Sequence, residues 1–340
     1  MAAVAREIAR LAGMAGGTGA TGDAVTIYFG GGSPALCDLS PLGPAISSLL
    51  SQSKAKKTQL TAAGRRLPAL PASDCQLTTD DCEFTVELHP LDVTPSKLDE
   101  LKAIGVTRIS MGVQSLDDGV LRAMGRGYTA DKAARAFALV RSRFDNAGID
   151  LIIGYPGDSA KWIGRLSDWG LRHCSAYSLQ NERGLKDVPG DDAVLDGIRS
   201  VAAFLKSIGL ERYEISNYAA PGFECRHNLA VWRGEDYVGI GEGACGRVAL
   251  ARTRGVRSSG PDAPFATTSQ SVTPQFDLKE RTIFRLRTRD GLDASRFPEW
   301  IPALERFVEE GLLTQTPSAP VYRLTERGTE VCDAILAEIA

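Results

Sequence analysis

Short apolar runs alternate with segments of helical periodicity along the first two thirds of the chain. The runs predict β-strands over 25–29, 83–88, 107–113, 149–153, 174–179 and 211–216. Apolar residues at helical spacing predict helices over 2–13, 40–52, 94–104, 117–124, 131–144, 159–170 and 192–208. Strands and helices that alternate in this way are typical of parallel βαβ units with right-handed crossovers. The predicted fold class is therefore α/β, as a complete or partial (β/α) barrel.

The remaining segments determine the predicted domain organisation. The barrel pattern and its extension cover 1–251, with a polar insert at about 53–80 that is predicted as a surface loop. Residues 252–275 are rich in Arg, Ser, Thr, Pro and Gly and lack periodicity, which predicts a linker or loop. Residues 276–340 show a helix–helix–hairpin–helix pattern, which predicts a small winged-helix-like domain. Its evenly mixed charges do not favour DNA binding.

Charge and composition narrow the classes of function. The 340-residue chain carries a formal net charge of -3, which gives no support for nucleic acid as a partner. Its seven cysteines are odd in number and irregularly spaced, as in a reduced, intracellular protein rather than a disulfide framework. No stretch approaches the roughly 18 to 20 apolar residues of a membrane span, and the first residues lack the continuous apolar region of a signal peptide. We expect a cytoplasmic protein with no membrane span.

Three consecutive glycines, Gly30, Gly31 and Gly32, follow the first predicted strand and precede Ser33. Glycine has no side chain to pack and costs backbone entropy, so three in a row are not there to stabilise a strand. Exposed backbone N–H groups at such a turn suit a carboxylate, an amino acid or a phosphate. A tight turn that binds nothing is the alternative, and the glycines alone do not decide between the two.

Polar residues also lie in or directly after the next strands. Glu87 stands between Val86 and Leu88, Gln114 follows RISMGV, and Asp150 precedes the apolar run LII. Arg126 lies twelve residues beyond Gln114. Barrels build their sites from the ends of several strands, so these four residues form a candidate polar pocket. A structural salt bridge at Glu87 and a strand anchor at Asp150 are the alternatives.

The densest group of reactive side chains lies in YEISNYAAPGFECRHNLAVW, residues 213–232. The run Cys225-Arg226-His227-Asn228 could ligate a metal or heme iron, or its hydrogen bonds could hold a loop. The glycine-rich VGIGEGACG at 238–246 does not open a clear helix, so a dinucleotide site is weakly supported. Hydrolase and nucleoside-triphosphatase motifs of the GxSxG, GxxxxGK[ST] and HExxH types are absent from the sequence.

The order of the motifs resembles one family. YFGGGSP, EFTVELHP, GVTRISMGVQSLDDGVLRAMGR, GIDLIIGYPG, CSAYSLQNERG and YEISNYAAPGFECRHNLAVWRGEDYVGIGEGA occur in its order, and YRLTERG resembles its C-terminal domain. The family is that of radical SAM proteins related to oxygen-independent coproporphyrinogen III oxidase. The YEISN to GIG stretch resembles its heme chaperone branch, the HemW-like proteins. The resemblance implies a heme chaperone-like protein, with coproporphyrinogen III oxidation as the alternative.

The resemblance also implies cofactors and partners. S-adenosylmethionine would bind through the positions that match the family's pocket: Gly31, Gly32, Ser33, Glu87, Gln114, Arg126, Asp150 and the backbone near Gln180. Heme would be the cargo, with His227, Cys225 and Cys245 as possible iron ligands and a heme-accepting protein as partner. The smaller departures from the family are His89 before Pro90, Tyr128, and Cys245 after GxGxGA, where relatives often carry other residues.

One departure concerns the [4Fe-4S] cluster expected for the family. Relatives hold it with CxxxCxxC after their first strand, whereas Cys37 is the first cysteine here and that spacing does not occur. The helix at 2–13 resembles the one that follows this loop, so the first barrel strand is expected to be missing too. Two interpretations stay open, a chain that starts late or was cut, and a cluster-less relative. A third is a barrel enzyme that uses S-adenosylmethionine or a phosphate ligand without iron. Radical catalysis by this chain is therefore an open question.

Overall fold

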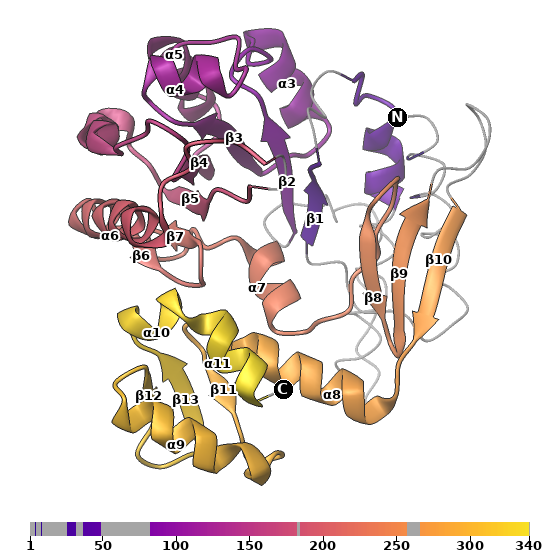
Figure 1. Ribbon diagram of the computed structural model, residues 1–340. Coiled ribbons are helices and arrows are strands. Elements are labelled where there is room, and N and C mark those ends of the chain that lie inside the picture. The colour runs from indigo at the N-terminus through magenta and orange to yellow at the C-terminus, as the bar shows by residue number, and fades with distance from the viewer. Residues whose placement is uncertain are drawn as a thin grey trace. The chain divides into compact units, whose positions relative to one another are not determined.

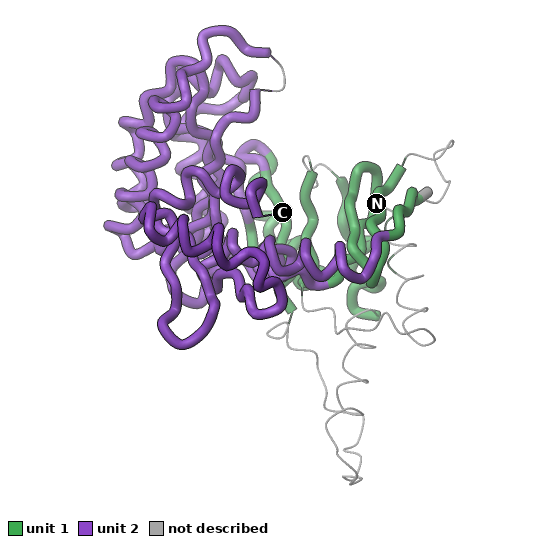
Figure 2. The backbone as a smooth tube through the Cα atoms, turned by 60° about the horizontal axis from the view of Figure 1, so that its bottom comes forward, with its two compact units in different colours: residues 1–88, 92–109, 236–271 green, residues 89–91, 110–235, 272–340 purple. Residues whose placement is uncertain are grey.

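The computed structural model describes residues 4, 8, 26–31, 37–48, 82–181, 184–256 and 266–339 (Figure 1). The chain forms two compact units, coloured separately in Figure 2. The first contains residues 1–88, 92–109 and 236–271, and the second contains 89–91, 110–235 and 272–340. Each unit is therefore built from segments that are far apart in the sequence.

The main sheet has seven strands in the order β1-β2-β3-β4-β5-β7-β6. Their bounds are β1 Thr26–Phe29, β2 Glu83–Leu88, β3 Arg108–Gln114, β4 Ala147–Ile153, β5 His173–Ser178, β6 Glu211–Arg212 and β7 Asn217–Ala219. β1 pairs with β2 in parallel, as β4 does with β5. The predicted α/β class with a parallel sheet is confirmed.

Helices connect these strands, as the periodicity predicts. They cover 42–48, α3 Pro95–Ala103, α4 Asp118–Ala123, α5 Ala130–Arg141 and α6 Asp191–Ser207. The predicted helix at 159–170 is a 3-10 helix, η3 Lys161–Trp169, which begins after Ala160 at a left-handed φ of 52°. Among these connecting helices, side-chain caps precede three: Thr94 before α3, Asp117 before α4 and Thr129 before α5. Each accepts a hydrogen bond from a first-turn backbone N–H that would otherwise lack a partner.

The strands of the second unit alternate between an apolar and a polar face. In β4, Ile149 and Leu151 are fully buried, while Asp150 between them is half-buried. β5 repeats the pattern, with Cys174 and Ala176 buried on one face and Ser175 on the other. Because side chains of a strand alternate between its two faces, the apolar face packs on helix α6 and the opposite face collects polar groups.

The prediction of one continuous strand over 211–216 is wrong. Residues 211–219 instead make an antiparallel hairpin of β6 and β7, and β7 runs antiparallel to β5. The reversal occurs because the Tyr213 N–H donates to the Asn217 carbonyl at 3.1 Å, which closes the chain over Glu214–Ser216. Strand-like composition predicts an extended chain here but does not reveal that the partner strand follows at once.

The first unit also contains a three-stranded antiparallel sheet of order β10-β9-β8. Its strands are β8 Cys245–Val248, β9 Ala251–Val256 and β10 Ala266–Ser271. Residues 252–275, predicted as a linker or loop, therefore contain β10 and most of β9. The Arg- and Thr-rich strands alternate without an apolar face, so their composition resembles that of a loop.

The C-terminal segment folds around its own core. Its elements are α8 Pro274–Phe284, η4 Arg285–Arg287, β11 Leu292–Asp293, η5 Pro298–Trp300, α9 Ile301–Glu309, β12 Leu313–Gln315, β13 Val321–Leu324, α10 Glu326–Glu330 and α11 Cys332–Ile339. The sheet order is β11-β13-β12, with β12 and β13 as a hairpin. Leu286, Leu292, Leu304 and Tyr322 are fully buried. Helices followed by this hairpin are the winged-helix-like pattern that the sequence predicts.

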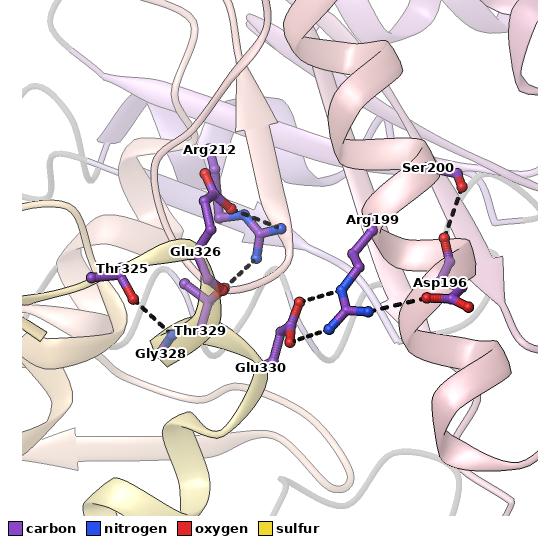
Figure 3. A network of polar contacts seen from close by, with 9 residues as sticks. All are labelled: Asp196, Arg199, Ser200, Arg212, Thr325, Glu326, Gly328, Thr329 and Glu330. Carbon is purple, nitrogen blue, oxygen red and sulfur yellow. Dashed lines mark hydrogen bonds and ion pairs between the residues drawn. The ribbon is translucent and has the colours of Figure 1, made fainter. Parts of the chain in front are cut away.

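Charged side chains fasten the C-terminal segment to α6 and the β6–β7 hairpin within the second unit (Figure 3). Arg199 on α6 donates from Nε and Nη2 to the two carboxylate oxygens of Glu330, each at 2.7 Å. Arg212 donates to the Thr329 hydroxyl at 3.2 Å and lies 3.8 Å from the Glu326 carboxylate. A two-point Arg–carboxylate contact fixes orientation as well as charge.

This network yields a charge-swap prediction. Glu330→Arg will lower the thermal unfolding midpoint more than Glu330→Gln, because it places two guanidinium groups together instead of removing one attraction. The double variant Arg199→Glu with Glu330→Arg will recover most of the loss, which differential scanning calorimetry can measure. A double variant that is no more stable than Glu330→Arg alone would show that this contact does not fasten α10 to α6.

Candidate functional site

The turn after β1 is shaped by Glu87. The Tyr28 hydroxyl donates to Glu87 Oε1 at 2.8 Å, and the Gly31 N–H donates to Oε2 at 3.1 Å. A Cβ on Gly30 would lie 2.5 Å from Glu87 Oε1, so a side chain there would displace the carboxylate. Gly31 has a φ of 85° with open space around its Cβ position, so its backbone conformation requires glycine. Gly32 and Ser33 lie outside the described residues.

Asp150 and Ser110 form the polar contact on neighbouring strands β3 and β4. The Ser110 hydroxyl lies 3.0 and 3.1 Å from the two carboxylate oxygens of Asp150. Ser110 is almost fully buried and Asp150 is half-buried. Sequence reasoning selected Asp150 but missed Ser110, although the alternation of RISMGVQ places Ser110 on the same strand face as Gln114.

Gln114 ends β3 in an uncommon backbone conformation. Its φ is 67°, and the following Ser115 N–H donates back to the Val113 carbonyl at 2.8 Å. A left-handed conformation outside glycine costs about 1–3 kcal/mol and concentrates at functional sites. The Gln114 side chain is half-buried. The conformation supports the sequence-based choice of Gln114 without showing a ligand.

Arg126 lies two residues before Tyr128, whose hydroxyl contacts the same strand. The Tyr128 hydroxyl donates to the carbonyls of Gly112 and Val113, at 2.9 and 3.1 Å. Burial raises the pKa of Tyr128 to about 12, and the positive charge of Arg126 opposes that rise. Arg126 itself is half-buried, and its Nε is buried without a hydrogen-bond partner in the described structure. A buried donor without a partner is costly, so this atom is suited to meet a ligand.

Gln180 and His89 lie at the ends of other strands. Gln180 is exposed just beyond β5, where the Leu179 N–H donates to the Ile153 carbonyl at 2.8 Å. His89 follows β2 and packs edge-on against Tyr128, with ring centroids 4.9 Å apart. The side chains of His89 and Tyr128 therefore contact each other.

The three possible heme ligands differ in exposure. Cys225 directly precedes α7 Arg226–Trp232 and is fully buried. His227, in the first turn of α7, is half-buried. Cys245 begins β8 in the first unit, where its exposed thiol contacts the Gly243 carbonyl at 3.7 Å. Exposure therefore favours His227 and Cys245 over Cys225 as contacts for a large ligand.

Two buried residues of the β6–β7 hairpin contact both ends of α7. The Tyr213 hydroxyl accepts from the Cys225 N–H at 3.2 Å and lies 2.8 Å from His173 Nε2. Glu214 accepts from the Trp232 indole N–H at 3.1 Å and from the Asn217 side-chain amide. Burial raises the pKa of Glu214, against these hydrogen bonds, which lower it. The sequence groups these residues but contains no spacing rule that pairs Glu214 with Trp232.

The described residues contain no group of three or more His, Cys, Asp and Glu side chains arranged for a metal ion. The CxxxCxxC spacing of the family's cluster motif does not occur in the sequence. Within the described part of the chain, none of the helices has the length and apolar character needed to cross a membrane.

Comparisons with known proteins identify the class of protein that this fold represents. The model of the radical SAM superfamily matches residues 4–169. The structure of coproporphyrinogen III oxidase (HemN) from Escherichia coli, described as a radical SAM enzyme, superimposes with a TM-score of 0.71. That alignment covers 98% of this chain and 81% of HemN at 19% identity, so it shows the fold alone. The chain has the radical SAM fold of the HemN type.

Sequence relatives define the branch. The heme chaperone HemW of Bacillus subtilis is 31% identical over 93% of this chain and 86% of its own length. The HemW of Escherichia coli K12 is 29% identical over 92% of this chain and 82% of its own. The chain therefore belongs to the HemW-like branch of the radical SAM superfamily, which confirms the resemblance seen in its motifs.

Glu214 makes a prediction about pH. Its folded-state pKa lies above its ordinary value of 4.5, so its contribution to stability is present below pH 4.5 and is lost as the pH rises through the folded pKa. Wild type will therefore gain stability relative to Glu214→Gln on acidification from neutral pH, when both are unfolded with urea at a series of pH values. A difference that stays constant, or that grows in favour of the glutamine variant in acid, would contradict this prediction.

Proposed function

We propose that this protein binds heme and S-adenosylmethionine and delivers heme to an acceptor protein. The observation that carries the proposal is the match to a curated heme chaperone over 93% of this chain and 86% of the relative. The odd number and irregular spacing of the seven cysteines agree with a reducing, cytoplasmic setting for the transfer. Nucleic acid has no part in the proposal.

The polar residues of the strand ends fit S-adenosylmethionine by their chemistry. When bound, this molecule brings an ammonium, a carboxylate, a sulfonium and two ribose hydroxyls. Glu87 and Asp150 are carboxylates suited to the donors among these groups, and the unpartnered Nε of Arg126 is suited to the carboxylate. Gln114 adds an amide, and the backbone of Gly31 and the region near Gln180 complete the proposed set. Gly32 and Ser33 belong to it by the resemblance.

The chain's own residues therefore bind and orient S-adenosylmethionine in this proposal. We propose no role for an iron–sulfur cluster, since the CxxxCxxC spacing does not occur in the sequence. The Tyr28 hydroxyl and the Ser110 hydroxyl each donate to one of the two carboxylates. These contacts hold Glu87 and Asp150 in one orientation before a ligand arrives.

For heme, we propose His227 as the axial ligand. His227 lies in the first turn of α7 and is half-buried, so it is more accessible than Cys225. Neutral imidazole is a common ligand of heme iron. Cys225 needs local opening to reach iron because it is fully buried, and Cys245 is exposed in the other unit. These two thiols are the alternative heme ligands, and their mutation tests each of them.

The S-adenosylmethionine site predicts the effect of two isosteric variants. Glu87→Gln and Asp150→Asn will each weaken binding by roughly tenfold or more in isothermal titration calorimetry, because a charged hydrogen bond contributes about 1.5–3 kcal/mol. Asp196→Asn on α6 is the control, since its carboxylate is exposed and pairs only with Arg199 among the ion pairs of the described residues. Unchanged affinity in both test variants would remove these carboxylates from the site.

The heme site predicts a ranking of three alanine variants. His227→Ala will weaken hemin binding by roughly tenfold or more, since even the outer partners of metal ligands are worth ~10- to 100-fold. Cys225→Ala and Cys245→Ala will change it less, as measured by titration of the Soret absorbance. If Cys245→Ala alone removed binding, the ligand assignment would move to that thiol. If all three variants bound hemin as wild type does, none of them is the ligand.

A further inference from the structure

The two ends of α7 are held by two consecutive residues of the β6–β7 hairpin. Tyr213 and Glu214 are 1% and 3% exposed. The Tyr213 hydroxyl accepts from the backbone N–H of Cys225, the residue before α7, at 3.2 Å. The Glu214 carboxylate accepts from the indole N–H of Trp232, the last residue of α7, at 3.1 Å. One short segment therefore contacts the helix at both its beginning and its end.

Tyr213 and Glu214, which together form a clamp on α7, are themselves held in place by other residues. Glu214 accepts a second hydrogen bond from the side-chain amide of Asn217 on β7 and forms a backbone bridge with Thr288. Tyr213 lies between the Cys225 N–H and the fully buried His173, 2.8 Å from its Nε2. Gly148 makes room for that histidine, because a Cβ there would lie 2.9 Å from the imidazole. Both clamp residues are thus anchored to the main sheet.

Trp232 is fixed from the other side as well. Its ring packs edge-on against Phe284 with centroids 5.9 Å apart, and the Arg287 guanidinium lies 5.2 Å from its ring centroid. The indole N–H therefore has one orientation, directed at Glu214. An indole nitrogen only donates and an ionised carboxylate only accepts, so the pair has a single hydrogen-bonding arrangement.

The helix needs such support. α7 has seven residues and no side-chain cap at its N-terminus, and isolated helices of this length are not stable in water. Burial of the Glu214 carboxylate is costly, as its raised pKa indicates. An apolar contact would hold the helix at lower cost but would not determine the direction of the indole. The hydrogen bond between Glu214 and Trp232 thus determines the orientation of the indole, at a cost to the stability of the fold.

We propose that Tyr213 and Glu214 are positioning residues that orient α7 and thereby present His227 to heme. This inference rests on the proposed heme binding at α7. The clamp acts through Trp232 at one end of the helix and through the Cys225 backbone at the other. Neither residue touches the iron or the porphyrin in this account. Release of either end lets the helix turn or fray, and the imidazole then loses its set direction.

A double-mutant cycle tests the clamp in the full-length chain. Glu214→Gln removes the charge of the acceptor, and Trp232→Phe removes the donor but keeps an aromatic ring against Phe284. Each single variant will weaken hemin binding by roughly tenfold, the effect of one charged hydrogen bond. The double variant will be no weaker than the more affected single variant, because both remove one interaction. Tyr213→Phe will weaken hemin binding through the other end of the helix.

Spectra distinguish positioning from general stability. The ferric heme of Glu214→Gln and Trp232→Phe will show an altered Soret maximum and altered electron paramagnetic resonance signals, because the axial imidazole is misplaced. Asp290→Asn is the matched control, since it breaks the exposed contact with Arg233 next to α7 and leaves Glu214 and Trp232 in place. It will retain the wild-type affinity and spectrum.

The outcomes separate this inference from the function on which it rests. If wild type does not bind hemin, the proposed function and the clamp's role both fail. If wild type binds hemin and the folded Trp232→Phe protein has the same affinity and spectrum, only the clamp is overturned. If Glu214→Gln does not fold, Trp232→Phe and Tyr213→Phe still decide the question. Additive losses in the double variant would show that Glu214 does not act through Trp232.

Discussion

Buried polar side chains must find hydrogen-bond partners, and this requirement organises the polar face of the main sheet. Asp150 is placed by the Ser110 hydroxyl, and Glu87 by the Tyr28 hydroxyl and the Gly31 N–H. Glu214 is satisfied by donors from β7 and α7. In each case a carboxylate within or beside a strand joins elements that no apolar contact would orient as closely. The same contacts that stabilise the fold therefore preorganise its candidate site.

The requirement also explains where glycine is needed. Gly30 has to lack a side chain because the Glu87 carboxylate occupies that space, whereas Gly31 is needed for its positive φ. Gly30 and Gly31 thus meet two separate constraints, crowding and backbone conformation. The Glu87 carboxylate contacts both residues, since it occupies the Cβ position of Gly30 and accepts the Gly31 N–H.

Much of the fold can be predicted because buried apolar residues recur at a regular spacing in the sequence. β3, β4 and β5 are recognised from apolar residues such as Ile149 and Leu151, which alternate with polar ones. The sequence does not predict the hairpin at 211–219, because composition does not indicate which strand pairs with which. It does not predict β9 and β10 either, because Arg- and Thr-rich strands lack an apolar face.

The candidate site was predictable only in part. Glu87 and Asp150 are recognised because a carboxylate inside an apolar run is unusual, and Gln114 follows such a run. Ser110 gives no comparable signal, because a small hydroxyl side chain occurs anywhere in a strand. The contact between Glu214 and Trp232 spans eighteen residues of a loop and helix, and only the folded chain brings them together. Side-chain contacts that depend on tertiary packing cannot be predicted from the spacing of residues along the sequence.

Because the chain belongs to the HemW-like branch, the central proposal is that heme binds at α7. Hydrogen–deuterium exchange of the full-length protein with and without hemin tests this directly, because amide exchange reports local opening along the chain. If heme binds at α7, amide exchange over 226–232 will slow on addition of hemin, and exchange over α9 at 301–309 will not change. Unchanged exchange over 226–232, together with protection elsewhere in the chain, would contradict it.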